Sequence, residues 1–301
     1  MLDLKIRDIH FSSPIIAASG TFGYGDEFQG FVDLSKIGSV ITKSITLEER
    51  KGNPSPRIHQ SNSGMINSIG LANMGVHSFC DTKLISLNNL ETNYIVSVAG
   101  STLDEYVEVI KELEQSNGSN IGYEINISCP NVKEGGIEFG VNKDVTFTLT
   151  SKLRELTDKL LIIKLTPNVT NIVDIALAAE SAGADAISAV NTFQGLAIDH
   201  RTGKMLLSTK FGGISGPQIK PLALAKVHKI YEKISIPILG MGGIVSHEDV
   251  IEFLRVGASM IQIGTLNFRD PSLISHIYDG LNSFMRKNSF SNLSDLIGTY
   301  H

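Results

Sequence analysis

The sequence predicts a (β/α)8 barrel that forms a single domain over residues 1–301, with a small N-terminal hairpin and inserted loops at one end. Three observations lead to this fold class. Eight short apolar runs recur along the chain, most of them are almost continuously apolar, and amphipathic helical segments lie between them. Continuously apolar strands are typical of a parallel sheet that is covered on both faces. Eight such strands alternating with helices predict a closed barrel.

The predicted strands are short and rich in β-branched residues. In chain order they are PIIAAS (14–19), SVITK (39–43), YIVSVAG (94–100), GYEINIS (122–128), LIIKLTP (161–167), DAISAV (185–190), IPILGMGG (236–243) and SMIQIG (259–264). Most are followed by a polar loop and then by a helical pattern, as a barrel of repeated β–α units requires.

Helices are predicted where apolar residues recur every three or four positions. In 103–113 these are Leu103, Val107, Ile110 and Leu113, and in 144–160 they are Phe147, Leu149, Leu153, Leu156 and Leu160. A further helix is predicted after Ser246, because a serine followed by Glu248 and Asp249 is typical of an N-cap with an acidic first turn.

The alternative fold is a doubly wound sheet, which usually carries G-x-G-x-x-G after its first strand. The corresponding segment reads ASGTFGYG and does not match. Residues 2–12 are expected to form a hairpin below the barrel. Segments 44–93 and 191–220 are too long for plain connections, so they are expected to build the functional site.

Composition excludes several function classes. The net charge is -5 and no basic tract occurs, which disfavours nucleic acid as a partner. The N-terminus has no long apolar region, and no stretch is long enough to span a membrane, so we expect a cytoplasmic protein. The 2 cysteines form no C-x-x-C pair, so neither a structural metal nor an iron–sulfur cluster is expected in this chain.

In a barrel of this kind, catalytic groups come from the C-terminal ends of the strands. Those ends carry a polar ring rich in amides and lysines. Its members are Ser19, Lys43, Ser97, Asn126 with Cys129, Lys164, Asn191, Gly242 with Gly243, and Gly264 with Thr265.

The last two strand ends, GMGGI and IGTLN, are typical of a phosphate site. Their glycines leave backbone N–H groups accessible after strands seven and eight, where barrels commonly hold a phosphate. Each loop alone could equally be a tight turn, but both together favour phosphate.

Lysines and asparagines suggest a flavin and a pyrimidine. Lys164 lies in an apolar strand and could stabilise an anionic reduced flavin ring, and Lys43 could serve the substrate in a similar way. Asn67, Asn126, Asn131 and Asn191 could read the lactam edges of a pyrimidine. The alternatives are snorkelling lysines and ordinary turn asparagines.

Cys129 follows a predicted strand end and could act as a base toward a carbon acid. A small buried apolar residue is the alternative, and Cys80 in HSFCDTKL fits that alternative well.

With these residues, the sequence resembles the class 1 dihydroorotate dehydrogenases over about residues 1–285. The shared motifs occur in order: TKS (42–44), NSIGLAN (67–73), NISCPN (126–131), KLTPN (164–168), VNT (190–192), GGISGP (212–217), GMGGI (240–244) and IGT (263–265).

The resemblance implies oxidation of dihydroorotate to orotate in pyrimidine biosynthesis. It makes Cys129 the base that removes the C5 proton, while the C6 hydride passes to N5 of FMN. The implied substrate residues are Lys43, Asn67, Ser68, Ile69, Gly70, Leu71, Asn126, Asn131, Asn191 and Thr192. The implied FMN residues are Ser19, Lys43, Ser44, Ser97, Asn126, Lys164, Val190, Gly216, Gly242, Gly243, Gly264 and Thr265, and the last four surround the phosphate. Residues 131–140 would form a lid.

Within class 1, NVKEGGIEFG, VNTFQG and RTGK resemble the NAD-dependent 1B type. That type implies a partner subunit with FAD and a [2Fe–2S] cluster, in a heterotetramer built on a homodimer of catalytic chains. Two features depart from it: Ser97 stands where asparagine is usual, and ITKSITLEERKGNP resembles the fumarate-using 1A type. A non-catalytic phosphate-binding barrel and a different flavin oxidoreductase are the remaining alternatives.

Overall fold

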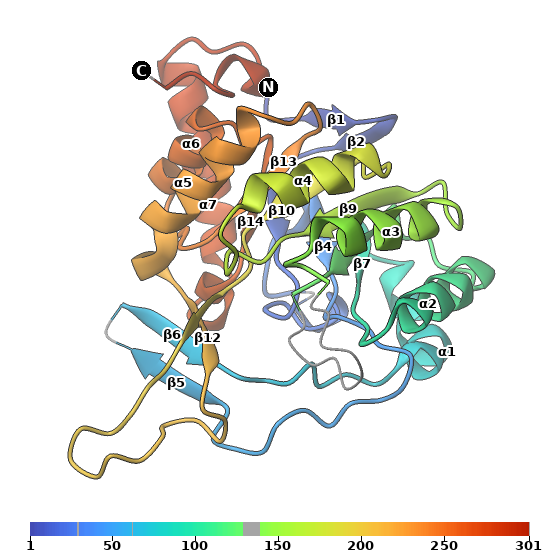
Figure 1. Ribbon diagram of the computed structural model, residues 1–301. Coiled ribbons are helices and arrows are strands. Elements are labelled where there is room, and N and C mark those ends of the chain that lie inside the picture. Colours follow the sequence, from blue (N-terminus) through green and yellow to red (C-terminus); the bar gives the residue numbers. More distant parts are fainter. Residues whose placement is uncertain (29, 62, 129–138, 301) are drawn as a thin grey trace.

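The computed structural model describes residues 1–28, 30–61, 63–128 and 139–300 (Figure 1). Within these residues, eight parallel strands close into a barrel, as the sequence predicts. In chain order the strands are β3 (Ile15–Ala17), β4 (Ser39–Ile41), β7 (Asn93–Val98), β8 (Gly122–Asn126), β9 (Leu160–Lys164), β10 (Ala186–Ala189), β13 (Ile238–Met241) and β14 (Met260–Ile263). Each pairs with the strands before and after it in this order, and β14 pairs with β3 to close the ring.

Helices pack around the outside of the barrel (Figure 1). They are α1 (Val76–Leu87), α2 (Leu103–Gln115), α3 (Lys143–Arg154), α4 (Ile172–Ser181), α5 (Lys220–Tyr231), α6 (His247–Arg255) and α7 (Leu273–Lys287). Short 3-10 turns are η1 (Asp26–Phe28), η2 (Leu34–Lys36), η3 (Pro217–Ile219), η4 (Thr265–Phe268) and η5 (Leu293–Asp295). In the described part of the chain, none of the helices is both long and apolar enough to cross a membrane.

The helix predicted over 144–160 is too long. α3 ends at Arg154, and Leu160 is the first residue of β9. Leu149 and Leu153 are buried as expected, but Phe147 is 45% exposed. Phe147 lies two residues from Leu149, which is about 200° around a helix, so the two side chains point in nearly opposite directions.

A hairpin closes the N-terminal end of the barrel. β1 (Leu4–Ile6) and β2 (Ile9–Phe11) pair antiparallel, which confirms the hairpin expected within residues 2–12. Its Ile6 and Phe11 are almost fully buried in an apolar cluster with interior residues of the barrel strands, including Leu160 and Met260. The barrel is therefore filled at this end.

The two long inserts form a second sheet. β5 (Ile58–Ser61) and β6 (Gly64–Asn67) come from the first insert, and β11 (Phe193–Gly195) and β12 (Gly212–Ser215) from the second. They pair antiparallel in the order β11-β12-β6-β5. Figure 1 places this sheet at the end of the barrel opposite the hairpin, which is the end where the strands finish. The inserts therefore build walls around the expected site.

Candidate active site

The interior of the barrel changes from apolar to polar along its axis. The end near the hairpin is filled by residues such as Ile16, Ile95 and Ile162. Toward the strand ends, the fully or almost fully buried side chains include those of Ser97, Lys164 and Ser188. Burying a polar side chain costs free energy, so a cluster of such side chains in an otherwise apolar barrel indicates a binding site. This end of the barrel is therefore the candidate site.

Three serines from successive strand ends form a row of hydroxyls. The Oγ atoms of Ser44 and Ser97 share a hydrogen bond of 2.9 Å, and Ser19 Oγ lies 3.5 Å from Ser44 Oγ. Ser97 also donates its backbone N–H to Thr42 Oγ1 at 3.1 Å. Ser44 thus contacts the short Ser97 side chain, and the hydroxyl row can offer hydrogen bonds to a ligand.

Lys164 is paired inside the barrel. Its Nζ donates to Glu124 Oε1 at 3.0 Å, and the lysine is 4% exposed whereas Glu124 is fully buried. Lys164 thus pairs with a carboxylate of the protein itself inside the barrel, and the snorkelling alternative is wrong.

Lys43 differs from Lys164. It follows β4 and is half-buried, and its side chain makes no hydrogen bond or ion pair with any residue that the structure describes. Burial lowers the pKa of the Lys43 ammonium, and the nearby Arg57 guanidinium lowers it further. An anionic ligand would stabilise the charged form of this half-buried lysine, because its charge compensates for the interactions with water that burial removes.

Two of the predicted asparagines touch each other. Asn191 Nδ2 donates to Asn126 Oδ1 at 3.3 Å, and Asn126 Oδ1 also accepts the Ser128 N–H at 3.3 Å. Asn191 Oδ1 in turn accepts the Thr192 N–H at 2.7 Å. The ends of β8 and β10 therefore present adjacent amide groups.

Asn67 reaches the same region from the second sheet. Its Nδ2 donates to the Gly213 carbonyl at 3.4 Å. A Cβ added at Gly213 would lie 2.2 Å from Thr192 Oγ1, so Thr192 packs directly on this glycine. The predicted substrate residues Asn67 and Thr192 are thus brought together by β6 and β12.

Hydrogen bonds from Asn53 hold a four-residue loop in place, which consists of Ser68, Ile69, Gly70 and Leu71. Asn53 donates its N–H to Ile69 O at 3.0 Å and its Nδ2 to Ser68 O at 2.8 Å. Leu71 has a φ of 54°, a left-handed conformation that a leucine rarely adopts. Ser68 Oγ is buried without a hydrogen-bond partner among the described residues, so it can bond a ligand.

The predicted phosphate loops lie side by side, because β13 pairs with β14. Gly242 and Gly243 have φ values of 131° and 77°, and a Cβ at Gly243 would lie 2.9 Å from Gly216 O. Gly264 caps η4, which begins at Thr265. Only glycine allows this close approach, and the resulting cradle fits a phosphate group.

The remaining predicted residues are placed as follows. Val190 is buried and donates its N–H to Met241 O at 3.1 Å. Cys129, Asn131 and most of the predicted lid at 131–140 lie outside the described residues. Cys80 lies on α1, where it packs partly buried against the main core, as its apolar interpretation predicts.

Sequence reasoning missed three residues of the site: Glu124, Ser188 and Gln262. They form a buried network around Lys164. Glu124 and Gln262 are polar residues inside otherwise apolar strands, and this was the available signal. All three side chains belong to residues inside the strands, before the strand ends at which the predicted site residues lie.

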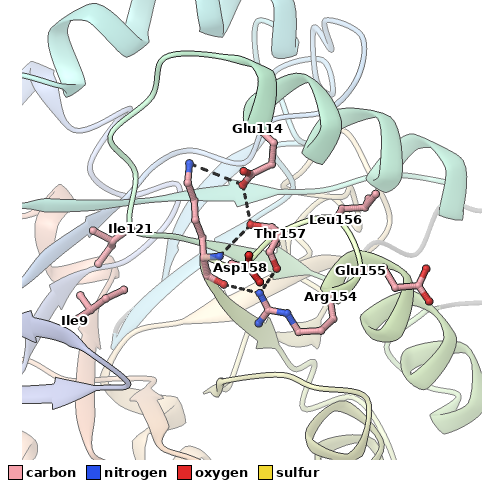
Figure 2. A pocket seen from close by; sticks show the side chains of 9 residues that line it. Ile9, Glu114, Ile121, Arg154, Glu155, Leu156, Thr157 and Asp158 are labelled. Atoms are coloured by element: carbon pink, nitrogen blue, oxygen red, sulfur yellow. Dashed lines mark hydrogen bonds and ion pairs between the residues drawn. The ribbon is translucent and has the colours of Figure 1, made fainter.

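A cavity of about 530 Å³ lies at the other end of the barrel (Figure 2). It is lined by Ile9 of the hairpin and by residues 154–159 before β9. Its polar groups bond one another: Arg154 donates to the Lys159 carbonyl at 2.8 Å, and Thr157 Oγ1 donates to Glu114 at 2.7 Å. This cavity contains none of the predicted site residues.

Comparison with known proteins gives consistent matches. The family model described as dihydroorotate dehydrogenase matches residues 1–285. The chain is 43% identical over 297 residues to the dihydroorotate dehydrogenase B (NAD(+)) catalytic subunit of Geotalea uraniireducens, covering 99% of this chain and 97% of that protein. The protein of the same name from Porphyromonas gingivalis is 46% identical over 296 residues, covering 97% of this chain and 95% of that protein.

Proposed function

Because the chain belongs to the dihydroorotate dehydrogenase family, we propose that it oxidises dihydroorotate with FMN as its cofactor and Cys129 as the general base. The reaction itself, NAD-linked oxidation of dihydroorotate to orotate in pyrimidine synthesis, follows from the family and from relatives 43% and 46% identical over nearly the whole chain. The observation that carries the proposed cofactor is the polar strand-end layer next to a glycine cradle.

FMN fits the groups at this end of the barrel. Gly242, Gly243, Gly264 and Thr265 would hold its phosphate through backbone N–H groups. The hydroxyl row, Lys164, Val190 and Gly216 would hold the ring and its chain. When bound, the flavin supplies an acceptor for the substrate hydride.

The substrate would lie between the asparagine side chains and the second sheet. Asn126 and Asn191 would read the lactam edges of its ring, with Asn67, Thr192 and the proposed contact from Asn131. The ammonium of Lys43 would pair with the carboxylate of the substrate, an anionic partner that this half-buried cation does not have among the described residues. The loop from Ser68 to Leu71 would close over the ring, and residues 131–140 would exclude water.

Cys129 is proposed as the base because of its place in the chain. It follows β8 by three residues, and β8 ends at Asn126, which faces the candidate site. A thiolate there would act as the base that takes the C5 proton of dihydroorotate.

The relatives are named catalytic subunits of an NAD(+) enzyme, and we propose a partner subunit for this chain as well. That subunit would carry FAD and a [2Fe–2S] cluster, in a heterotetramer of two catalytic and two electron-transfer chains built on a catalytic homodimer. A cytoplasmic location and a single domain over residues 1–301 stay predictions. The fumarate-using 1A type is the second candidate, favoured only by the segment ITKSITLEERKGNP.

Replacement of Cys129 by Ala tests the role of the base. The variant should still bind FMN, while reduction of the flavin by dihydroorotate slows by about 10²–10⁴-fold, the usual contribution of a positioned base. Anaerobic stopped-flow absorbance of the flavin measures this half-reaction. Cys80→Ala is the matched control, because Cys80 lies on α1 away from the strand ends, and its rate should equal that of the wild type.

Equal rates in Cys129→Ala and the wild type would remove Cys129 as the base. A wild-type chain that binds no FMN, or whose flavin is not bleached by dihydroorotate, would contradict the proposed function as a whole.

A further inference from the structure

A charged group is buried beneath the strand-end layer. The Glu124 side chain is fully buried, and each of its carboxylate oxygens accepts at least one hydrogen bond. Oε1 accepts Lys164 Nζ at 3.0 Å, whereas Oε2 accepts Ser188 Oγ at 2.8 Å and Gln262 Nε2 at 2.7 Å. Gln262 Nε2 also donates to Ser188 Oγ at 2.7 Å. Four strands, β8, β9, β10 and β14, thus contribute one side chain each to a single network.

The network lies directly below the candidate site. Asn126 of β8 and Lys164 of β9 are paired in register, and Lys164 is paired with Ser188 of β10. Glu124 is two residues before Asn126, so both side chains point to the same side of their strand. Glu124 is in register with Ile162, which belongs to the apolar filling of the barrel. The carboxylate therefore marks the boundary between the filled end and the polar end.

Stability alone does not explain the network. Replacing a buried ion pair by apolar side chains is often neutral or stabilising, because desolvation offsets the attraction between the charges. Gln262 Oε1 is buried without a hydrogen-bond partner among the described residues, which is unfavourable. The residues below this layer show that the barrel interior can be filled with isoleucine and leucine.

The contact with Glu124 uses only part of the hydrogen-bonding capacity of the Lys164 ammonium. An ammonium has three N–H donors, and Glu124 takes one of them among the described residues. A carboxylate that is itself held by Ser188 and Gln262 fixes the position of Nζ, while the other donors can reach a ligand above it. A partner that orients a ligand-binding side chain in this way is common around cofactors.

We propose that Glu124 is a positioning residue, which holds the Lys164 ammonium against the pyrimidine edge of the flavin and is itself held by Ser188 and Gln262. This role rests on the proposed FMN site. Lys164 stabilises negative charge on the reduced ring, and Glu124 acts on the flavin through Lys164.

A double-mutant cycle of Glu124→Gln and Lys164→Met tests the proposal. FMN affinity is measured by titration of the FMN-free chain, and the midpoint potential of the bound flavin is measured by dye-linked reduction. Glu124→Gln should weaken FMN binding about tenfold and lower the midpoint potential, because the released ammonium stabilises the reduced ring less. In the Lys164→Met background, Glu124→Gln should change neither quantity.

Asp185→Asn is the matched control for lost stability. Asp185 pairs with Arg154 at 2.8 Å near the start of β9, at the far end of the barrel from the site. This change should lower stability and leave both FMN affinity and flavin potential unaltered.

Gln262→Met keeps the test decisive if Glu124→Gln does not fold. It removes the donor to Glu124 Oε2 together with the unpartnered Oε1, so the fold should tolerate it. The potential should shift in the same direction as in Glu124→Gln, by a smaller amount.

Three results would overturn the role of Glu124. The first is an unchanged potential in both Glu124→Gln and Gln262→Met. The second is an equal shift with and without Lys164, which would mean that Glu124 does not act through it. The third is a raised potential in Glu124→Gln, the effect of removing a nearby negative charge rather than of releasing the lysine. A wild-type chain that binds no FMN would overturn the proposed function and this role together.

Discussion

At the scale of single residues, the two lysines of the site differ in how their charge is accommodated. Lys164 donates to a buried carboxylate, whereas Lys43 is half-buried and has no side-chain partner in the described part of the chain. Desolvation of an unpaired ammonium disfavours its charged form. We therefore expect Lys43 to lower the stability of the ligand-free fold, as a binding residue often does.

We expect Lys43→Met to stabilise the FMN-free, substrate-free chain at neutral pH. Burial lowers the pKa of Lys43 below its ordinary 10.5, so the unfolded chain binds the proton more tightly than the folded chain. The destabilisation is fully present below the lowered pKa and disappears as pH rises to 10.5. The gain at pH 7 should be no more than about 1 kcal/mol, because a half-exposed ammonium keeps much of its hydration.

Urea unfolding of the two chains at several pH values between neutrality and the ordinary lysine pKa measures this gain, which should shrink as pH rises. Lys36→Met is the control of opposite sign, because the hydrogen bond to Asp279 raises the pKa of Lys36. That pair stabilises the fold below the ordinary lysine pKa, so its loss should destabilise the chain at pH 7. A Lys43→Met chain that is less stable than the wild type at pH 7 would refute the argument.

Lys43→Met should also weaken dihydroorotate binding by roughly 10–100-fold, the range expected when a hydrogen bond to a charged group is lost. Together, the two measurements would separate the binding role of the lysine from its effect on the fold.

At the scale of elements, the loop after β13 is anchored by the first turn of α6. Ser246 Oγ accepts the Asp249 N–H, and Asp249 Oδ2 accepts the N–H groups of Val245 and Ser246. Asp249 Oδ1 also accepts Lys220 Nζ at 2.6 Å, which ties α6 to α5. The glycines proposed to hold the phosphate, Gly242 and Gly243, lie just before this capping box.

Ser246→Ala should therefore affect both stability and cofactor binding. Loss of an N-cap typically costs about 1 kcal/mol, and here it also loosens the phosphate loop, so FMN affinity should fall several-fold. Asn171→Ala is the matched control: Asn171 caps α4 by accepting the Val173 N–H at 3.2 Å. It should lose similar stability without a change in FMN affinity. Equal effects of the two variants on affinity would show that the cap does not serve the phosphate loop.

The elements that depend on local patterns were predictable, and those set by long-range pairing were not. The eight strands, the hairpin and the Ser246 cap follow from residues within a few positions of one another. The apolar spacing after α3 continues through Leu156 into β9, so the pattern alone could not place the end of the helix at Arg154. The second sheet joins β6 to β12, for example Asn67 to Gly213, which no local pattern indicates.

At the scale of the whole molecule, function depends on the change from apolar to polar side chains along the barrel axis. The hairpin and the lower strand residues fill one end, while polar side chains from many strand ends gather at the other. Reading the strand ends indicates that their side chains gather at one face, because the ends of parallel strands meet there. It could not find the Glu124 network, since Gln262 lies 138 positions from Glu124 and only closure of the barrel joins them.

In the proposed function, the electron acceptor depends on the proposed partner subunit. The relatives are named catalytic subunits of an NAD(+) enzyme, and the proposed function gives this chain the role of the half that oxidises dihydroorotate. We expect dihydroorotate to reduce the flavin of the isolated chain at a catalytic rate. Neither NAD nor fumarate should then reoxidise it at a catalytic rate, and NAD should do so once the proposed partner subunit is added.

Anaerobic absorbance of the flavin band, after mixing the reduced chain with each acceptor, measures this reoxidation. A sample reduced by dithionite in place of dihydroorotate is the control, because it separates a missing electron route from inhibition by bound orotate. Rapid reoxidation by fumarate in both samples would assign the chain to the 1A type instead. Rapid reoxidation by NAD without a partner would mean that the chain reaches its acceptor directly, and the proposed division of the reaction between two subunits would then be wrong.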